Sequence, residues 1–296
     1  NGVNSALKGK KFGFSRASTD VKEIFHDDEL NTVVIATQHD THAKYAIDSL
    51  NANKNVWVEK PLAIDKDSLG LIEAAYFKAH ENVKNDSSGP QLMVGFNRRF
   101  APQVKKMQKL LSSISSPKTV IITVNAGHIS KDHWTQDSLV GGGRIIGEGC
   151  HFIDLMRFLV GKKIISVNGR AMFSNTLRSN LTDQSSITLG FEDGSFGTIL
   201  YLANGSKNFP KERVEIFSDG KILQLDNFRK LKGYGWKGFN KYNLWSQNKG
   251  QQACTDTFIK SIKKGVPCIP VEEIFEVSRA SIQANEILLN QSINPV

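Results

Sequence analysis

Two side chains in this sequence stand where acid–base chemistry would need them, and the first is a lysine at the end of an apolar run. The stretch NVWVEKPLA ends a predicted buried strand, Val56 to Val58, on Glu59, Lys60 and Pro61. A strand that only packs would finish on a turn residue. Oxidation of a carbinol needs a group that accepts the hydroxyl proton. A lysine can do this where burial or nearby positive charge lowers its pKa, although most lysines are ordinary surface residues.

The second candidate is His151, which begins a helical pattern in GEGCHFID, so its ring can point into a cleft. The alternative is a core histidine satisfied by a backbone carbonyl. His39 and His42 form an H-x-x-H pair, but no third ligand accompanies them at a usable spacing. We therefore expect no metal, and we expect His42 to pack within its helix.

Further candidates follow a predicted strand or precede a glycine-rich turn. Arg98 and Arg99 could clamp a phosphate or a carboxylate, and solvation on a helix surface is the equal alternative. Trp134 is a substrate-side candidate, with Asp137 beside it. The triple glycine at 141–143 lacks the G-x-G-x-x-G pattern of a dinucleotide loop, so we interpret it as close backbone packing.

The elements that must position these residues alternate in the first hundred positions. Predicted strands at 32–37, 55–60 and 91–97 are separated by helical patterns at 42–52 and 65–80. This order predicts βαβ units and a parallel sheet, as in an α/β fold. In such sheets ligands bind beyond the carboxyl ends of the strands. The residues at those ends are Thr37 to His39, Glu59 to Pro61 and Asn97 to Arg99.

After about residue 99 the pattern changes to an α+β unit. A strand at 119–127 is followed by two hairpins that turn at Asp193-Gly194 and Asp219-Gly220. Two helices, 251–264 and 271–289, close the chain. We predict a dinucleotide-binding (Rossmann-like) parallel sheet that is incomplete over 1–98. An α+β domain with a large, mostly antiparallel sheet should follow over 99–296.

Four phrases carry a family resemblance: ATQHDTH, NVWVEKPLA, MVGFNRRFAP and GGGRIIGEGCHFIDLMRFLVG. In this order and at these separations the sequence resembles the Gfo/Idh/MocA oxidoreductases from about Lys11 to Leu288. Within that family it looks most like the C-terminal part of the bi-domain oxidoreductases. The ordered set is specific, whereas Glu-Lys-Pro alone occurs often by chance.

The resemblance implies a role for each candidate. It makes Lys60 and His151 the catalytic pair, and it implies a cis bond between Lys60 and Pro61. Many members carry Asp four residues before the histidine, whereas this chain has Gly147 there and Glu148 one place later. The implied cofactor-binding residues are Thr37, His39, Glu59, Lys60 and Pro61. The substrate-binding candidates are Arg98, Arg99, Trp134, Glu148 and His151.

The implied cofactor is NAD or NADP, yet the glycine fingerprint and the acidic ribose ligand are missing from these 296 residues. The family order places them in a first βαβ unit ahead of Asn1. We therefore expect Asn1 not to be the natural start, and we expect this stretch alone to bind dinucleotide weakly.

Composition limits the remaining classes. Three scattered cysteines and the lack of an apolar signal core favour a cytoplasmic location, and no apolar run is long enough to cross a membrane. The net charge of +9 and the basic, aromatic run 229–249 would suit single-stranded nucleic acid. No known nucleic-acid motif accompanies that run, so a strand and loop covering a sheet or subunit contact is the favoured interpretation.

We predict an NAD(P)-dependent oxidoreductase that moves hydride to or from a sugar, sugar-nucleotide or polyol carbinol. We expect a homo-oligomer formed through the C-terminal sheet, with no membrane or nucleic-acid partner. The main alternative is a non-catalytic sugar- or partner-binding module of the same fold, which Gly147 and the absent fingerprint favour.

Overall fold

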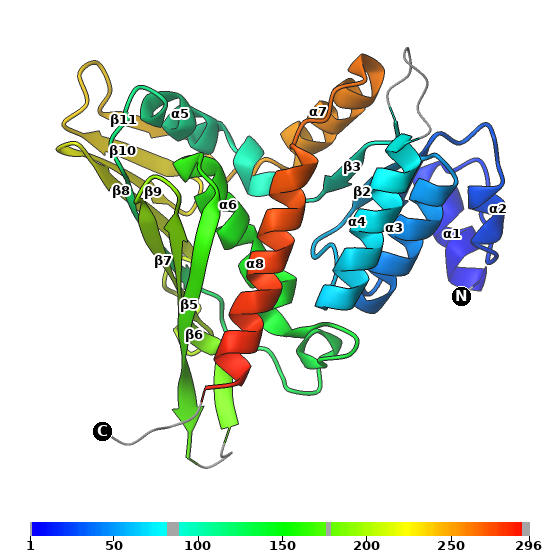
Figure 1. Cartoon of the computed structure of the whole chain (residues 1–296), viewed down its shortest axis with the longest axis horizontal. Coiled ribbons are helices and arrows are strands. Elements are labelled where there is room, and N and C mark those ends of the chain that lie inside the picture. Colours follow the sequence, from blue (N-terminus) through cyan, green and yellow to red (C-terminus); the bar gives the residue numbers. More distant parts are fainter. Residues whose placement is uncertain (1, 82–88, 176–178, 292–296) are drawn as a thin grey trace.

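The computed structural model describes residues 2–81, 89–175 and 179–291, which form two β-sheets with helices between them (Figure 1). A small parallel sheet has the strand order β1-β2-β3. A large sheet has the order β11-β10-β9-β8-β4-β7-β6-β5, and only its β4–β7 pair is parallel among the described strand pairs. The predicted fold class is confirmed.

The central and third strands of the small sheet are apolar runs buried on both faces, as parallel strands usually are, whereas Val34 of the first strand is 67% exposed. Val56 and Val58 of its central strand have no exposed surface. The strand ends fall within the predicted ranges. The helix after Asp65 also begins as expected, because the Asp65 carboxylate accepts a hydrogen bond from Ser68 N at 2.8 Å and so caps the helix. The elements are β1 (Thr32–Ile35), β2 (Asn55–Val58), β3 (Leu92–Val94), α1 (Gly2–Phe12), α2 (Lys22–Phe25), η1 (His39–Thr41), α3 (His42–Asn51) and α4 (Lys66–Glu81).

The large sheet has one covered and one open face. Along β4 buried residues alternate with partly exposed ones, which is the period-two pattern of a sheet packed on one side. Both predicted hairpin turns are confirmed, since β6–β7 and β8–β9 pair across them. The strands are β4 (Thr119–Asn125), β5 (Ile164–Ser174), β6 (Ser179–Phe191), β7 (Phe196–Leu202), β8 (Glu212–Ser218), β9 (Lys221–Asp226), β10 (Lys230–Tyr234) and β11 (Lys241–Asn243). Thus the basic run 229–249 supplies the two strands at one edge of the sheet.

The helices of the second half lie largely between the sheets (Figure 1). Helix α8 contacts α4 on one side and β5 on the other, while α7 returns to the small sheet, where Phe258 meets Trp57 edge-on. Both closing helices have the predicted bounds. The elements are η2 (Asn97–Phe100), α5 (Pro102–Leu111), η3 (Trp134–Gln136), η4 (Ile145–Gly149), α6 (Cys150–Val160), α7 (Gln251–Lys264) and α8 (Val271–Leu289).

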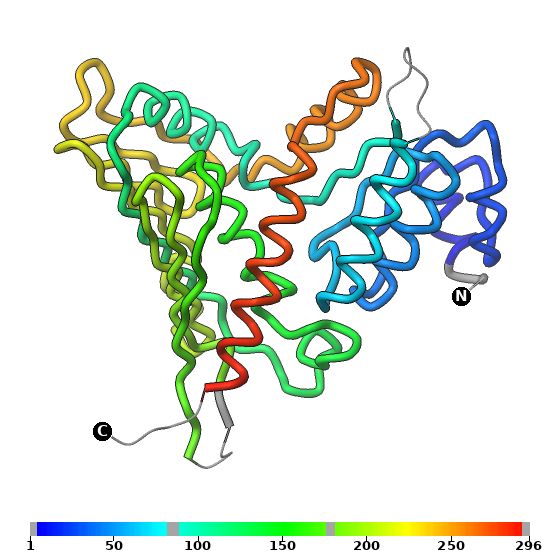
Figure 2. The backbone as a smooth tube through the Cα atoms, in the orientation of Figure 1, coloured from blue at the N-terminus to red at the C-terminus, as the bar shows by residue number. Residues whose placement is uncertain are grey.

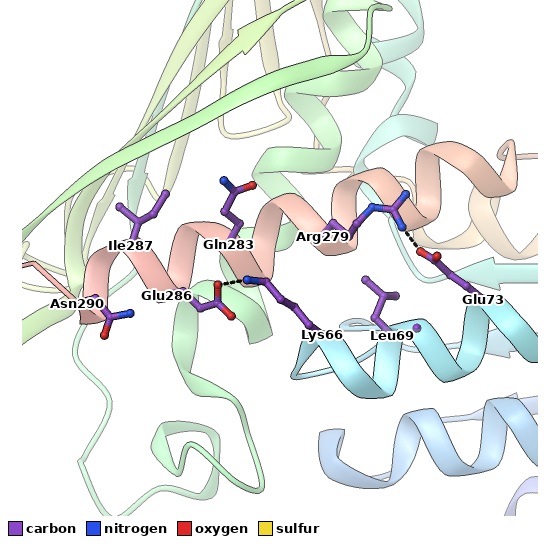
Figure 3. Close-up of a pocket in the computed structure, with 9 residues that line it drawn as sticks. Lys66, Leu69, Glu73, Arg279, Gln283, Glu286, Ile287 and Asn290 are labelled. Carbon is purple, nitrogen blue, oxygen red and sulfur yellow. Dashed lines mark hydrogen bonds and ion pairs between the residues drawn. The ribbon is translucent and has the colours of Figure 1, made fainter.

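A pocket of about 610 Å³ separates α4 from α8 at the outer surface (Figure 3). Two ion pairs cross it, Lys66 with Glu286 and Glu73 with Arg279. Its lining includes none of the candidate catalytic residues. These exposed pairs connect the two layers but contribute little stability individually.

The chain passes from the small sheet toward the large one through η2, and its path can be followed in the backbone trace (Figure 2). Two adjacent arginines in η2 are buried. Arg98 pairs with Glu212 of β8 at 2.9 Å. Arg99 pairs with Asp154 of α6 at 2.6 Å and with Glu273 of α8 at 2.7 Å. The crossover is therefore tied by charge to the strand and both helices that it meets.

We predict that Asp154→Ala destabilises the fold by about 3–5 kcal/mol, because it leaves the buried Arg99 guanidinium short of a counter-charge. Burial raises the pKa of Asp154 to about 6, so the pair is ionised at pH 7.5, where urea unfolding should be measured. Asp48→Ala breaks the exposed Lys44–Asp48 pair and serves as the control, with an expected loss below about 1 kcal/mol. Equal losses would contradict this account of the crossover.

Candidate active site

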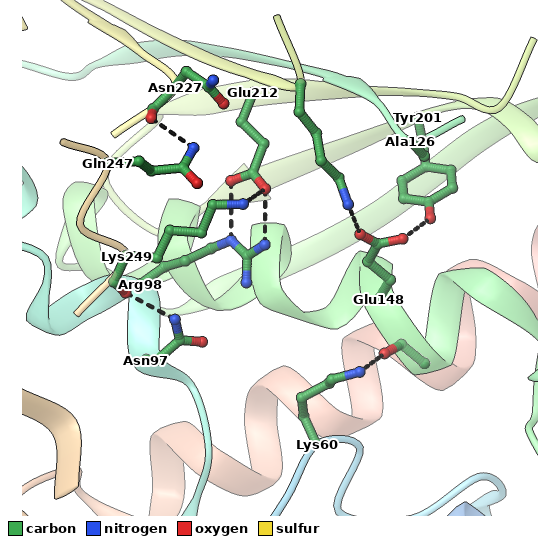
Figure 4. Close-up of polar contacts among 12 residues, drawn as sticks. Lys60, Asn97, Arg98, Ala126, Glu148, Tyr201, Glu212, Asn227, Gln247 and Lys249 are labelled. Atoms are coloured by element: carbon green, nitrogen blue, oxygen red, sulfur yellow. Dashed lines mark hydrogen bonds and ion pairs between the residues drawn. The ribbon is translucent and has the colours of Figure 1, made fainter. Parts of the chain in front are cut away.

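The candidate active site lies where the carboxyl ends of the small sheet's strands meet the start of α6. Lys60, directly after β2, donates a hydrogen bond from Nζ to the Gly147 carbonyl at 2.5 Å (Figure 4). The predicted cis bond between Lys60 and Pro61 is confirmed. His42 faces the carbonyl oxygens of Pro61 and Thr37 at 2.7 and 3.1 Å, so its ring joins two strand ends.

Gly147 stands where many members of the resembling family carry Asp, and the structure shows what surrounds this position. Gly147 lies in a single π-helical turn, Ile145–Gly149, that precedes α6. A Cβ atom at Gly147 would lie 3.0 Å from Cε1 of the buried His39 ring. A larger residue here would require the His39 ring to move. Because glycine has no side chain, Gly147 presents only its backbone to Lys60.

Glu148 is turned toward the large sheet, away from the lysine (Figure 4). Its carboxylate accepts hydrogen bonds from Tyr201 Oη and from Lys211 Nζ and Arg144 Nη2, the last two at 2.7 Å. Burial alone would raise the pKa of Glu148, but Lys211, Tyr201 and Arg144 outweigh it and lower the value to about 2. Glu148 is therefore a fixed anion that neither accepts nor donates a proton near neutral pH.

His151 is 7% exposed, and its Nδ1 has no hydrogen-bond partner among the described residues. Burial lowers its pKa well below the usual value, and positive charge on Arg98, Lys60, Lys249 and Lys211 lowers it further. The ring is therefore neutral, with one N–H donor and one acceptor nitrogen. A buried nitrogen without a partner is unusual. The ring as a whole lines the pocket beside it.

His39 and Trp134 meet although 95 positions separate them in sequence, with ring centroids 4.8 Å apart and an edge-on angle. Burial, with help from the charge on Lys60, lowers the pKa of His39 to about 4, so the ring is neutral. Its Nδ1 donates to the Gly141 carbonyl at 2.8 Å. The triple-glycine segment 141–143 thus packs closely against the rim. This agrees with the prediction of close backbone packing, which was made because the segment lacks the G-x-G-x-x-G pattern.

The other predicted residues divide between the site and the core. Arg98 lines a pocket of about 330 Å³ beside His151, whereas Arg99 is 3% exposed and its guanidinium is taken up by two carboxylates. Thr37 is exposed at the end of β1, where its Oγ1 lies 2.6 Å from that of Thr41. The pocket is lined by Trp57, Glu59, Gly95, Asn97, Arg98, His151, Lys249, Gln251, Cys254 and Thr255.

Three site residues were missed by sequence reasoning: Tyr201, Lys211 and Lys249. Tyr201 alternates with exposed residues along β7, a pattern that fits any core position. Lys249 ends the basic run 229–249, for which the sequence favours a strand and loop covering a sheet or a subunit contact over a nucleic-acid platform. Its amine contacts Glu212 at 2.7 Å, a pairing that depends on tertiary structure.

Residues 2–81, 89–175 and 179–291 contain neither a candidate metal-binding cluster nor a candidate membrane-spanning helix. No group of three or more His, Cys, Asp or Glu side chains in these ranges could hold a metal ion. No helix in them is long and apolar enough to cross a membrane.

Two family models match the sequence. The model described as the oxidoreductase family, NAD-binding Rossmann fold, matches residues 3–84, and the GFO/IDH/MocA C-terminal domain matches residues 107–222. The two matches fall on the small sheet and on the large sheet. The chain belongs to the Gfo/Idh/MocA oxidoreductase family.

Curated relatives include sugar-alcohol dehydrogenases. The chain is 28% identical to inositol 2-dehydrogenase 2 of Saccharopolyspora erythraea over 203 residues, 65% of this chain and 55% of that protein. It is 25% identical to myo-inositol 2-dehydrogenase of Thermotoga maritima over 272 residues, 87% of this chain and 77% of that protein. An uncharacterized oxidoreductase of Bacillus subtilis is 26% identical, and the match spans 60% of its length.

Solved structures share the fold. A levoglucosan dehydrogenase in complex with NADH and levoglucosan has a TM-score of 0.78 at 21% identity, covering 97% of this chain and 86% of that one. An oxidoreductase domain protein from Kribbella flavida has a TM-score of 0.80 at 22% identity, with the same coverage.

We predict that Glu148→Gln makes the free energy of unfolding less dependent on pH at acidic pH. A folded pKa of about 2 against an ordinary 4.5 means that the stability contributed by the carboxylate is present above pH 4.5. It is lost as the pH falls toward 2 and amounts to at most about 3 kcal/mol, since one pKa unit corresponds to about 1.4 kcal/mol. Urea unfolding of both proteins from pH 7 to pH 2.5 should show the wild type losing its advantage below pH 4.5. A constant difference across this range would contradict the assignment.

Proposed function

We propose that the protein is an NAD(P)-dependent oxidoreductase that transfers hydride to or from a carbinol of a sugar or polyol. The observation that carries this proposal is the convergence of Lys60 and His151 from two different layers of the fold. The charge on Lys60 lies close enough to lower the pKa of His151, and both side chains border the same rim. Inositol and levoglucosan dehydrogenases among the relatives support a sugar or polyol substrate.

The residues at the rim fit the nicotinamide half of a dinucleotide. Gly95 leaves room beside Glu59, where a Cβ atom would lie 3.1 Å from the carboxylate oxygens. Glu59 and Trp57 line the pocket, and Lys60 follows Glu59 in the chain. We assign Thr37, His39, Glu59 and Pro61 to holding this part of the cofactor, which when bound supplies the hydride acceptor or donor. The choice between NAD and NADP lies with residues that bind the adenosine ribose.

In the oxidative direction the Lys60 amine accepts the hydroxyl proton while the carbinol carbon gives up hydride. The Gly147 carbonyl orients the lysine through a hydrogen bond and adds no full negative charge, which would favour the protonated ammonium. The neutral His151 ring lines the same pocket, where it binds the hydroxyl and fixes its direction. His39 and Trp134 pack against each other edge-on at the same rim.

A non-catalytic binding module of the same fold is the second candidate. It is favoured by Gly147, which stands where many family members carry Asp, and by Glu148, whose carboxylate is occupied by three donors. In that case the Lys60 amine would bind a ligand oxygen without proton transfer.

Lys60→Met separates the two candidates, since it keeps the aliphatic stem and removes the proton acceptor. We expect turnover in the natural full-length protein to fall by about 10²-fold or more, with a much smaller change in cofactor affinity. Reduction of NAD(P)⁺ at 340 nm with a panel of polyols and sugars provides the measurement, and Lys44→Met at an exposed ion pair provides the control. Undiminished turnover in Lys60→Met would remove the lysine from the chemistry.

We also propose that the protein self-associates through the open face of the large sheet. Phe196 of β7 and Phe217 of β8 both lie opposite Thr119 of β4, so the two rings share one face and one row. They are 51% and 37% exposed, on the side away from α6 and α8. Apolar rows of this kind on a sheet mark interaction surfaces.

The double variant Phe196→Glu, Phe217→Glu should convert the oligomer to a monomer, because it places charges on both sides of the contact. Light scattering after size-exclusion chromatography measures the mass. Leu139→Glu, at a residue 80% exposed in the segment before the triple glycine, should leave the assembly unchanged. If the double variant kept the wild-type mass, the interface would lie elsewhere.

A further inference from the structure

The cleft beside His151 holds more positive than negative side chains. In each of two clusters, two cations share one carboxylate: Arg98 and Lys249 share Glu212, while Arg144 and Lys211 share Glu148. Lys60 contacts only a backbone carbonyl among its described hydrogen bonds, and Glu59 is the remaining acid on the lining. The Lys60 amine is unprotonated when it accepts the hydroxyl proton, so it is not counted here. Four cations then stand against three anions, an excess of one positive charge, and Arg98, Lys249 and Glu59 among them line the pocket itself.

The nearby acids of the helix core do not cancel this excess. Asp154, Glu273 and Glu276 are paired with Arg99 and Arg157 between α6 and α8, and none of them lines the pocket. After burial, the four largest influences on the pKa of His151 are all cations, so the potential at the ring is positive.

Three of these cations also keep donors that make no hydrogen bond to the described residues. Lys211 and Lys249 each give one hydrogen bond of 2.7 Å to a carboxylate, which leaves two N–H groups on each ammonium. Arg98 bonds Glu212 through Nε and Nη2, and its Nη1 makes no hydrogen bond to the described residues. Among the described residues these donors have no further acceptors.

We propose that the substrate is a sugar acid, with its carboxylate bound by Lys211, Lys249 and Arg98 while the reacting hydroxyl lies between Lys60 and His151. This proposal rests on the proposed function and names its substrate class. The relatives named for neutral polyols and anhydrosugars do not imply it.

A carboxylate fits this place for two reasons. Partly buried excess charge is costly, and an anion between the two clusters offsets it through charge-assisted hydrogen bonds. These same amines already bind the carboxylates Glu148 and Glu212 at 2.7 Å, so their geometry suits such oxygens. The pocket volume of about 330 Å³ lies at the small end for ligand sites and suits one sugar unit better than a sugar nucleotide.

The test is equilibrium binding to the natural full-length protein by calorimetry, using matched pairs of ligands. The pairs are D-glucuronate with D-glucose, D-galacturonate with D-galactose, and D-gluconate with D-glucitol. We expect at least one acid to bind about 10-fold or more tightly than its neutral partner at low ionic strength. The gap should shrink in 0.5 M NaCl, because salt screens the attraction.

Lys211→Gln should reduce affinity for the preferred acid about 10-fold and leave its neutral partner within about 2-fold. Glu148 keeps its bonds to Tyr201 and Arg144 in this variant, and an unchanged melting temperature checks the fold. Lys221→Gln breaks a 2.7 Å ion pair of the same type at the β8–β9 turn and is the matched control.

The proposal is overturned if no acid binds more tightly than its neutral partner, or if D-glucose 6-phosphate binds more tightly than every carboxylate. Absorbance at 340 nm separates it from the proposed function. Selective binding of an acid without oxidation would contradict the enzyme assignment and support the anion site. Oxidation of neutral sugars with no preference for acids would support the enzyme assignment and contradict the anion site.

Discussion

The architecture depends on two adjacent arginines buried at the crossover between the sheets. Arg98 and Arg99 follow the third strand of the small sheet, and their side chains leave the backbone toward different partners: Glu212 in the large sheet, and Asp154 and Glu273 in helices α6 and α8. Because a buried guanidinium without a counter-charge is strongly destabilising, these pairs fix where the helices sit relative to the crossover. Lys60, on the neighbouring strand end, can meet the start of α6 because that position is fixed.

The start of α6 shows how one residue type changes the chemistry available at the rim. Gly147 offers only a carbonyl to Lys60, and its small size lets the His39 ring approach. The carboxylate one place later, Glu148, is held by Tyr201, Lys211 and Arg144 on the large-sheet side. In the proposed mechanism proton transfer therefore belongs to the lysine, while Glu148 holds cations beside the proposed substrate site.

Local patterns predicted most of the fold. Alternating apolar runs and helical spacing located the small sheet, Asp-Gly pairs located two hairpins, and the last two helices matched their predicted bounds. Helix α7 is delimited by glycines in the left-handed region, Gly250 at φ 83° and Gly265 at φ 67°, which is a local signal. The parallel pairing of β4 with β7 had no such signal, because strands far apart in sequence pair through the tertiary fold.

The site was predictable only where the family resemblance reached it. Lys60 and His151 were named as candidates from their motifs. The ion pairs of Arg98 and Arg99 were not predicted, because their partners lie 114 and 55 positions away in the sequence. Tyr201, Lys211 and Lys249 belong to the site through cross-sheet contacts that no spacing in the sequence indicates. Side chains whose role depends on a distant counter-charge require the structure.

The central claim is that the Lys60 amine accepts the hydroxyl proton, and chemical rescue tests it most directly. Lys60→Ala opens space at the end of β2 that a small primary amine can enter. We predict that methylamine or ethylamine restores turnover in proportion to its concentration, with a rate that depends on amine basicity as expected for proton transfer. Absence of rescue in Lys60→Ala, together with restoration of His151→Ala by imidazole, would contradict the claim and transfer the proton-accepting role to the histidine.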